Sequence, residues 1–201
     1  MIINSLTLNN QIHLADNQQN TTSTQNIDYI QANSYHSSMK DPIQSWKNKK
    51  EGAHKSLKKF TKKLSQHRGK HLDQFAAVTH EKVFQNIDCL DCAGCCSGLP
   101  PIVNKTDAQR ISKKIGLSIA DFETQYLTLD EDQDMVLQQT PCRFLMEDNK
   151  CSIYEFRPKA CREYPHTDVN FSKNLSYHAK NALYCPATFH ILEQLKKNIP
   201  V

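Results

Sequence analysis

Eight cysteines are the residues of this chain whose type and spacing could do chemistry. Half of them fall within residues 89–96, and none precedes position 89. They are Cys89, Cys92, Cys95, Cys96, Cys142, Cys151, Cys161 and Cys185. The first residues carry no positive and apolar secretion signal, so we expect a cytoplasmic location, where thiols stay reduced. Cysteines clustered this closely, in a chain whose thiols stay reduced, are better interpreted as metal ligands than as disulfide partners.

The octet 89–96 has the pattern Cys-x-x-Cys-x-x-Cys-Cys, which supplies three thiolates from one loop. This spacing is typical of ferredoxin-like iron–sulfur sites, and Gly94 permits the left-handed or tightly bent backbone that such a loop needs. Ferredoxin loops end in Cys-Pro, and Cys185-Pro186 is such a pair, although it lies far downstream. Zinc accepts four thiolates equally well, so an iron–sulfur cluster and a structural zinc ion both stay open. Eight cysteines allow two four-thiolate sites, or one site with spare thiols.

Arginines stand beside several of the cysteines and could offset the negative charge of metal thiolates. Arg157 and Arg162 are the residues that we expect to contact the cofactor, and Arg143 has a similar position. Their alternative role is to bond backbone carbonyls or neighbouring glutamates. Three histidines are weaker ligand candidates, since the thiols suffice: His166, His178 and His190.

The elements that must position these residues fall into three segments. Residues 1–45 are rich in Asn, Gln, Thr and Ser and predict a disordered polar tail, within which Met39 is an alternative start of translation. Residues 46–70 predict a basic amphipathic helix. That helix either packs its apolar stripe on the domain or offers a patch to an acidic partner. We favour packing, and nucleic acid is the less favoured partner because no base-reading motif accompanies the charge.

Residues 71–201 predict a small, mainly helical α+β domain with a short β-hairpin, held together by a cysteine-ligated metal site. We expect helices over 71–86, from Thr106 to about Gly116, from Ser118, over 156–163 and over 186–198. A strand is expected over 135–139, and a hairpin turn over 147–150. No run of about 18 apolar residues occurs, so no membrane span is expected.

The cysteine pattern also resembles a known family. The octet, Pro141 to Leu145, Cys151 to Pro165 and Cys185-Pro186 together are similar to the CxxCxxCC cysteine-cluster family (YkgJ-like), over about residues 85–190. The resemblance implies chelation of zinc or iron by the cysteines, and members are often labelled iron–sulfur oxidoreductases. A related branch is similar to flagellin lysine N-methylases, which are longer. This chain has no glycine-rich methyl-donor motif of the kind that follows a strand.

We therefore predict a metal-chelating protein that binds iron, as an iron–sulfur cluster, or zinc, with a redox role. One alternative is a zinc-containing binding module whose basic segment meets an acidic protein partner. The other is a relative of the protein lysine N-methylases. Whether the protein is an enzyme stays open, with iron–sulfur oxidoreductase as the candidate activity.

Overall fold

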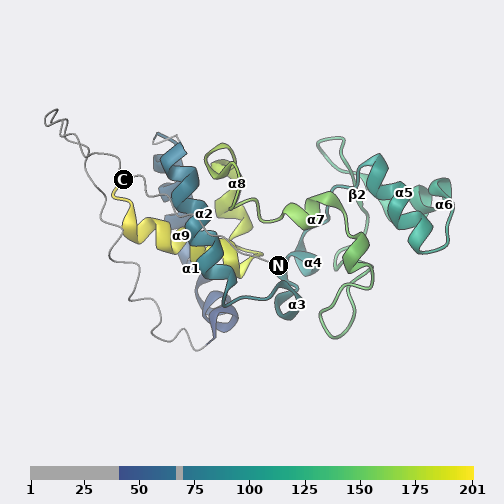
Figure 1. The fold of residues 1–201 in the computed structure, drawn as a ribbon, viewed down its shortest axis with the longest axis horizontal. Coiled ribbons are helices and arrows are strands. Elements are labelled where there is room, and N and C mark those ends of the chain that lie inside the picture. The colour runs from purple at the N-terminus through teal and green to yellow at the C-terminus, as the bar shows by residue number, and fades with distance from the viewer. Residues whose placement is uncertain (1–40, 67–69) are drawn as a thin grey trace, which may run out of the picture. The chain divides into compact units, whose positions relative to one another are not determined.

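The computed structural model describes residues 41–66 and 70–201 (Figure 1). These residues are mainly helical, with one two-stranded antiparallel sheet, which confirms the predicted α+β class. The predicted tail lies outside the described residues as far as position 40, and residues 42–45 belong to the first helix. Within the described ranges, no helix has both the length and the apolar character that a membrane crossing requires.

Four helices share the first hydrophobic core. They are α1 (Pro42–Leu64), α2 (Lys70–Phe84), α8 (Leu175–Asn181) and α9 (Pro186–Asn198). The carboxylate of Asp41 caps α1 by accepting the Gln44 N–H at 2.9 Å. The indole N–H of Trp46 donates to the Ala182 carbonyl at 2.8 Å, which ties α1 to the end of α8. The core thus joins the start of the described chain to its end.

The α1 helix buries one face and exposes lysines on the other. Leu57 and Leu64 are fully buried, and Trp46 and Phe60 nearly so. The exposed lysines are Lys47, Lys49, Lys55, Lys58, Lys59, Lys62 and Lys63. The apolar stripe therefore packs on the domain, as the favoured interpretation of the basic segment requires.

A second, smaller core forms around α5 (Lys105–Lys114) and α6 (Ile119–Tyr126), with Ile111 and Phe122 completely buried. Strands β1 (Leu127–Leu129) and β2 (Met135–Leu137) pair antiparallel, with Leu127 opposite Leu137. Ser118 caps α6 as predicted, because its hydroxyl accepts the Asp121 N–H at 3.1 Å.

The structure corrects two local predictions in this region. The cap of α5 is Asn104 and not Thr106, since the side-chain oxygen Oδ1 of Asn104 accepts the Asp107 N–H at 2.8 Å. The hairpin forms between residues 127 and 137, whereas the predicted turn at 147–150 closes a single bridge between Leu145 and Cys151. The chain winds into the 3-10 helix η2 (Tyr154–Phe156) directly afterwards, which leaves no residues to extend a strand.

The predicted helix over 156–163 is replaced by two short ones. These are η2 and α7 (Lys159–Glu163), with Pro158 at the cap of α7. Proline fixes its own φ and donates no hydrogen bond, so it separates the two turns. A further 3-10 helix, η3 (Phe171–Lys173), precedes α8 and packs against α2.

We predict that buried His178 makes the fold acid-sensitive. Its ring stacks on Phe171 and its Nε2 lies 3.1 Å from the Phe171 carbonyl oxygen, and burial lowers the pKa of His178 from 6.5 to about 4. Below pH 6.5 the unfolded chain therefore takes up a proton that the folded chain excludes. The free energy of unfolding should fall by up to about 1.4 kcal/mol per pH unit between pH 6.5 and 4.

Chemical denaturation from pH 7 to pH 5 measures this slope. His178→Gln should remove the contribution of His178 to the pH dependence of the free energy of unfolding. His71→Gln, at an exposed position, should leave that contribution in place. Equal slopes in wild type and His178→Gln would refute the assignment.

Candidate metal centre

The octet folds as two short helices, α3 (Cys89–Cys92) and α4 (Gly94–Gly98). The Asp88 carboxylate caps α3 by accepting the Leu90 N–H at 2.8 Å. Ala93 joins the helices with φ of 47°, in the left-handed region. The reversal that sequence reasoning assigned to Gly94 therefore falls one residue earlier, on a residue that adopts this conformation less easily.

Gly94 has a different role, which is close packing. A Cβ on Gly94 would stand 2.3 Å from the Tyr184 carbonyl oxygen, and one on Gly98 would stand 2.5 Å from the Tyr184 ring. Only glycine at both positions lets α4 lie against residue 184. This contact brings the adjacent Cys185 up to the octet.

One small cavity lies where α4 approaches residues 184 and 185. Its volume is about 20 Å³, and its lining includes the side chains of Ile87 and Tyr164. The thiols that line it are Cys89, Cys92, Cys95 and Cys185, here named the first thiol group. A space of this size takes one water-sized particle.

The other four cysteines form the second thiol group: Cys96, Cys142, Cys151 and Cys161. The Cys142 N–H donates to the Cys96 carbonyl at 2.8 Å. Cys151 pairs with Leu145, whose N–H donates to the Cys142 carbonyl at 2.9 Å. Burial, and then the charges of Cys96, Cys142 and Cys151, raise the pKa of Cys161 to about 12.

All eight cysteines are present as thiols, without disulfides. Across residues 41–66 and 70–201, no three Cys, His, Asp or Glu side chains are already arranged to hold one metal ion. Binding an ion therefore requires several thiols to turn toward a common point.

Backbone N–H groups point at several of the sulfur atoms. The Gly94 N–H donates to Cys92 Sγ at 3.4 Å, and the Thr188 N–H donates to Cys185 Sγ at 3.4 Å. Such donors stabilise a thiolate relative to a thiol, and they surround metal-bound thiolates for the same reason.

Burial opposes ionisation of most of these thiols. It raises the pKa of Cys185 to about 11 and is the main cause of the raised pKa of Cys89 and Cys92. The hydrogen bond between the Cys95 and Cys96 thiols lowers the pKa of Cys96 and raises that of Cys95. A metal must therefore displace protons, and its affinity falls as pH falls.

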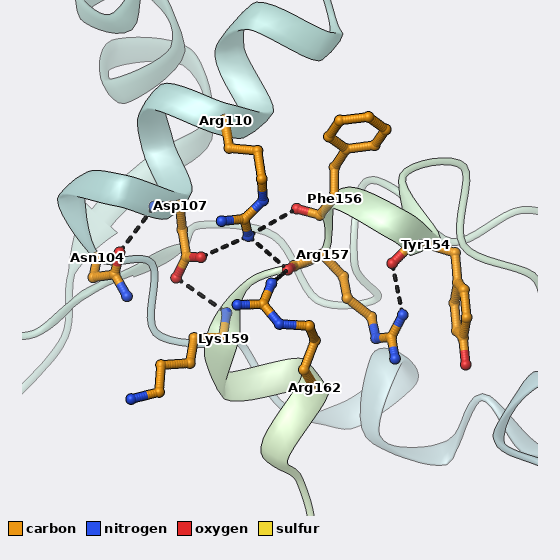
Figure 2. A network of polar contacts seen from close by, with 8 residues as sticks. All are labelled: Asn104, Asp107, Arg110, Tyr154, Phe156, Arg157, Lys159 and Arg162. Atoms are coloured by element: carbon orange, nitrogen blue, oxygen red, sulfur yellow. Dashed lines mark hydrogen bonds and ion pairs between the residues drawn. The ribbon is translucent and has the colours of Figure 1, made fainter.

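The arginines mostly bond backbone carbonyls, which is their alternative role. Arg157 stacks on the Tyr154 ring at 3.8 Å and donates to the Tyr154 carbonyl at 2.7 Å. Arg162 donates to the Arg157 carbonyl at 2.6 Å (Figure 2). Burial raises the pKa of the thiols at 89, 151 and 161, and the Arg157 charge offsets a small part of that rise. Contact of Arg157 and Arg162 with a cofactor stays a prediction.

The histidines do not line the cavity. His178 is buried against Phe171, and His190 bonds the Pro42 carbonyl at 2.9 Å. Tyr184 is the site residue that the sequence did not reveal. Its carbonyl and its ring lie against α4. The two glycines of α4 are the sequence feature that could have indicated this close contact.

An ion pair between buried Asp107 and partly exposed Arg110 positions α7, and sequence reasoning did not predict it. Asp107, 1% exposed, accepts from Arg110 at 2.7 Å and from the Lys159 N–H at 3.1 Å. Arg110 donates in addition to the carbonyls of Phe156 and Arg157 (Figure 2). This network fixes the turn before Cys161.

Comparison with known families gives one match. The model of the CxxCxxCC family, whose description reads "Putative zinc- or iron-chelating domain", matches residues 88–186. Neither the curated proteins nor the solved structures contain a match to this chain. The matched residues include every cysteine of both thiol groups. Residues 88–186 of this chain are thus similar to the CxxCxxCC family, whose domain is described as zinc- or iron-chelating.

Proposed function

We propose that the protein binds one zinc or iron ion through the first thiol group. The observation that carries this proposal is that Cys89, Cys92, Cys95 and Cys185 line one small cavity together. Three of these thiols come from the octet, and the fourth precedes α9, about ninety residues later.

The donor set fits such an ion. Four thiolates suit soft or borderline metals in tetrahedral coordination, which zinc and iron both adopt. A volume of about 20 Å³ fits a single ion better than a four-iron cluster. The N–H donors at Cys92 and Cys185 are already directed at sulfur, so part of the surroundings that a thiolate needs is in place.

A bound ion would stabilise the contact between α4 and residue 184. Cys185 belongs to the first hydrophobic core. The octet lies in the sequence between α2 of the first core and α5 of the second. Metal binding to thiols that come together only in the folded chain contributes directly to folding free energy.

An iron–sulfur cluster with a redox role is the second candidate. The Cys-x-x-Cys-x-x-Cys spacing and the Cys185-Pro186 pair favour it, since ferredoxin loops have both features. A cluster would supply one-electron transfer, and the Arg157 charge would offset part of its negative charge.

Metal and acid-labile sulfide per chain, measured on anaerobically purified protein, test the proposal. Zinc, or iron without sulfide, is expected, and Cys185→Ser should lower the content by one ion per chain. Ser97→Ala, within α4 but without a thiol, is the matched control and should keep the full content. Iron with equal sulfide would replace the proposal by the cluster, and a metal-free wild type would end both.

Gly94→Ala tests whether the packing of α4 on residue 184 creates the site. The new Cβ would stand 2.3 Å from a backbone oxygen, so the backbone must move. We expect a loss of about 1–3 kcal/mol in the free energy of unfolding, together with weaker metal binding in competition with a chelator.

Gly52→Ala is the matched control, because nothing lies within 4 Å of its Cβ position. It should stabilise α1 by up to about 1 kcal/mol and leave metal affinity unchanged. Equal metal affinity in Gly94→Ala and wild type would mean that this packing does not determine the site.

A further inference from the structure

We propose that α1 binds the phosphate backbone of double-stranded DNA, without reading its sequence, through four lysines on its outer side. They are Lys55, Lys58, Lys59 and Lys62, here named the lysine face, and all four are exposed. This inference does not depend on metal binding, because it concerns a surface that the proposed function leaves unused.

The spacing of the four lysines places them on one side of the helix. They stand at positions i, i+3, i+4 and i+7, which are neighbours on a helical surface. At about 100° and about 1.5 Å per residue, they occupy an arc of about 100° and extend about 10 Å along the axis. The opposite side of α1 buries Leu57, Phe60 and Leu64 in the first core. The lysine face therefore points away from the core.

Positive charge is concentrated on α1. The helix contains eight lysines and one glutamate, which gives it a net charge of +7. The whole chain has a net charge of +4, so the residues outside α1 sum to −3, the difference between +4 and +7. An excess of this size on one helix attracts a polyanion.

The lysine face has no role in holding the fold together. Lys50, by contrast, lies at the edge of the buried side and donates to the Leu183 carbonyl at 2.9 Å. Within residues 41–66 and 70–201, the ion pairs include no lysine of the face. Like charges four residues apart, as at Lys55 and Lys59, destabilise a helix. A bound polyanion would remove this repulsion.

The composition of α1 argues against a protein or a membrane as the partner. Protein interfaces are enriched in arginine and aromatic side chains and depleted of lysine. The helix contains no arginine, and its aromatic residues, Trp46 and Phe60, are buried. A helix that lies in a membrane surface inserts its apolar side into the lipid, and that side of α1 is occupied by the first core. Neither partner would find its usual anchor.

Phosphate groups require only positive charge. The missing base-reading motif excludes sequence-specific recognition, but contacts to phosphate carry no sequence information and need no such motif. A DNA duplex presents one charge per about 1.7 Å of axis, so about six phosphates lie within the length of the lysine face. Charge density and length are therefore complementary.

Two further features favour duplex DNA over other nucleic acids. Proteins that bind single strands stack the bases on exposed aromatic rings, and the lysine face has none. The major groove of B-form DNA admits an α-helix, whereas that of duplex RNA is deep and too narrow for side chains to read. The proposal therefore commits to duplex DNA.

Fluorescence anisotropy of a short labelled DNA duplex, titrated with the full chain at several salt concentrations, tests the inference. The dissociation constant should be about 10⁻⁴–10⁻⁶ M near physiological salt. The logarithm of the binding constant should fall with the logarithm of the salt concentration. Its slope should be about −0.9 per phosphate contact, or about −3.6 for four contacts.

Paired variants assign the binding to the lysine face. Lys55→Gln/Lys58→Gln/Lys59→Gln/Lys62→Gln should weaken binding by about tenfold or more and reduce the size of the slope by about 3. Glutamine forms helices as well as lysine does, so this variant should fold, which circular dichroism checks. Lys82→Gln/Lys105→Gln/Lys113→Gln/Lys173→Gln is the matched control. It removes the same charge from other exposed positions and should bind DNA like the wild type.

Three results would overturn the inference. The first is a wild type without detectable binding, or with a slope near zero, which requires no variant. The second is equal weakening in the two variants, since binding would then follow net charge and not α1. The third is tighter binding to phosphatidylserine vesicles, polyglutamate, single-stranded DNA or duplex RNA than to duplex DNA, which would assign the lysine face to that partner. All of these results leave the proposed metal site untouched.

Discussion

The close approach of α4 to residue 184 is the contact on which the rest of the structure depends. Glycine at positions 94 and 98 leaves room for the carbonyl and the ring of Tyr184, where any Cβ would collide. That contact places Cys185 against the octet across about ninety residues of chain. It also places α9, which follows Cys185 directly, in the core with α1 and α2. Local packing at two glycines thus determines both the shape of the cavity and the closure of the fold.

The distribution of thiols matches the division of the hydrophobic residues into two cores. A small core gains little free energy from apolar burial, and metal coordination is one way in which small domains compensate. Cys185 belongs to the first core, and Cys142 and Cys151 pack on the second. On α4, the thiols of Cys95 and Cys96 are hydrogen-bonded to each other, so the first and second thiol groups adjoin there. Arg157, whose charge acts on cysteines of both groups, lies where it can moderate the charge of either.

Many of the helices and their caps could be predicted from the sequence, because they depend on residues close together in the chain. The apolar stripe of α1, the Ser118 cap and the start of α9 at Pro186 follow from spacing and from capping chemistry. The pairing of β1 with β2 could not be predicted, because residues 127–129 continue the helical pattern of α6 and become a strand only through their partner. Asn104 and Thr106 are both good caps, and the buried contact of Asp107 with α7 favours the earlier one. The grouping of the cysteines depends on contacts between distant segments, which spacing alone does not encode.

The central claim is that cysteine thiolates are the ligands of the metal. X-ray absorption spectroscopy at the zinc or iron edge of the metal-loaded protein tests it most directly. The account predicts a first shell of four sulfur atoms, at about 2.3 Å if the metal is zinc. A first shell made mainly of nitrogen or oxygen would place the metal on other residues and contradict the account.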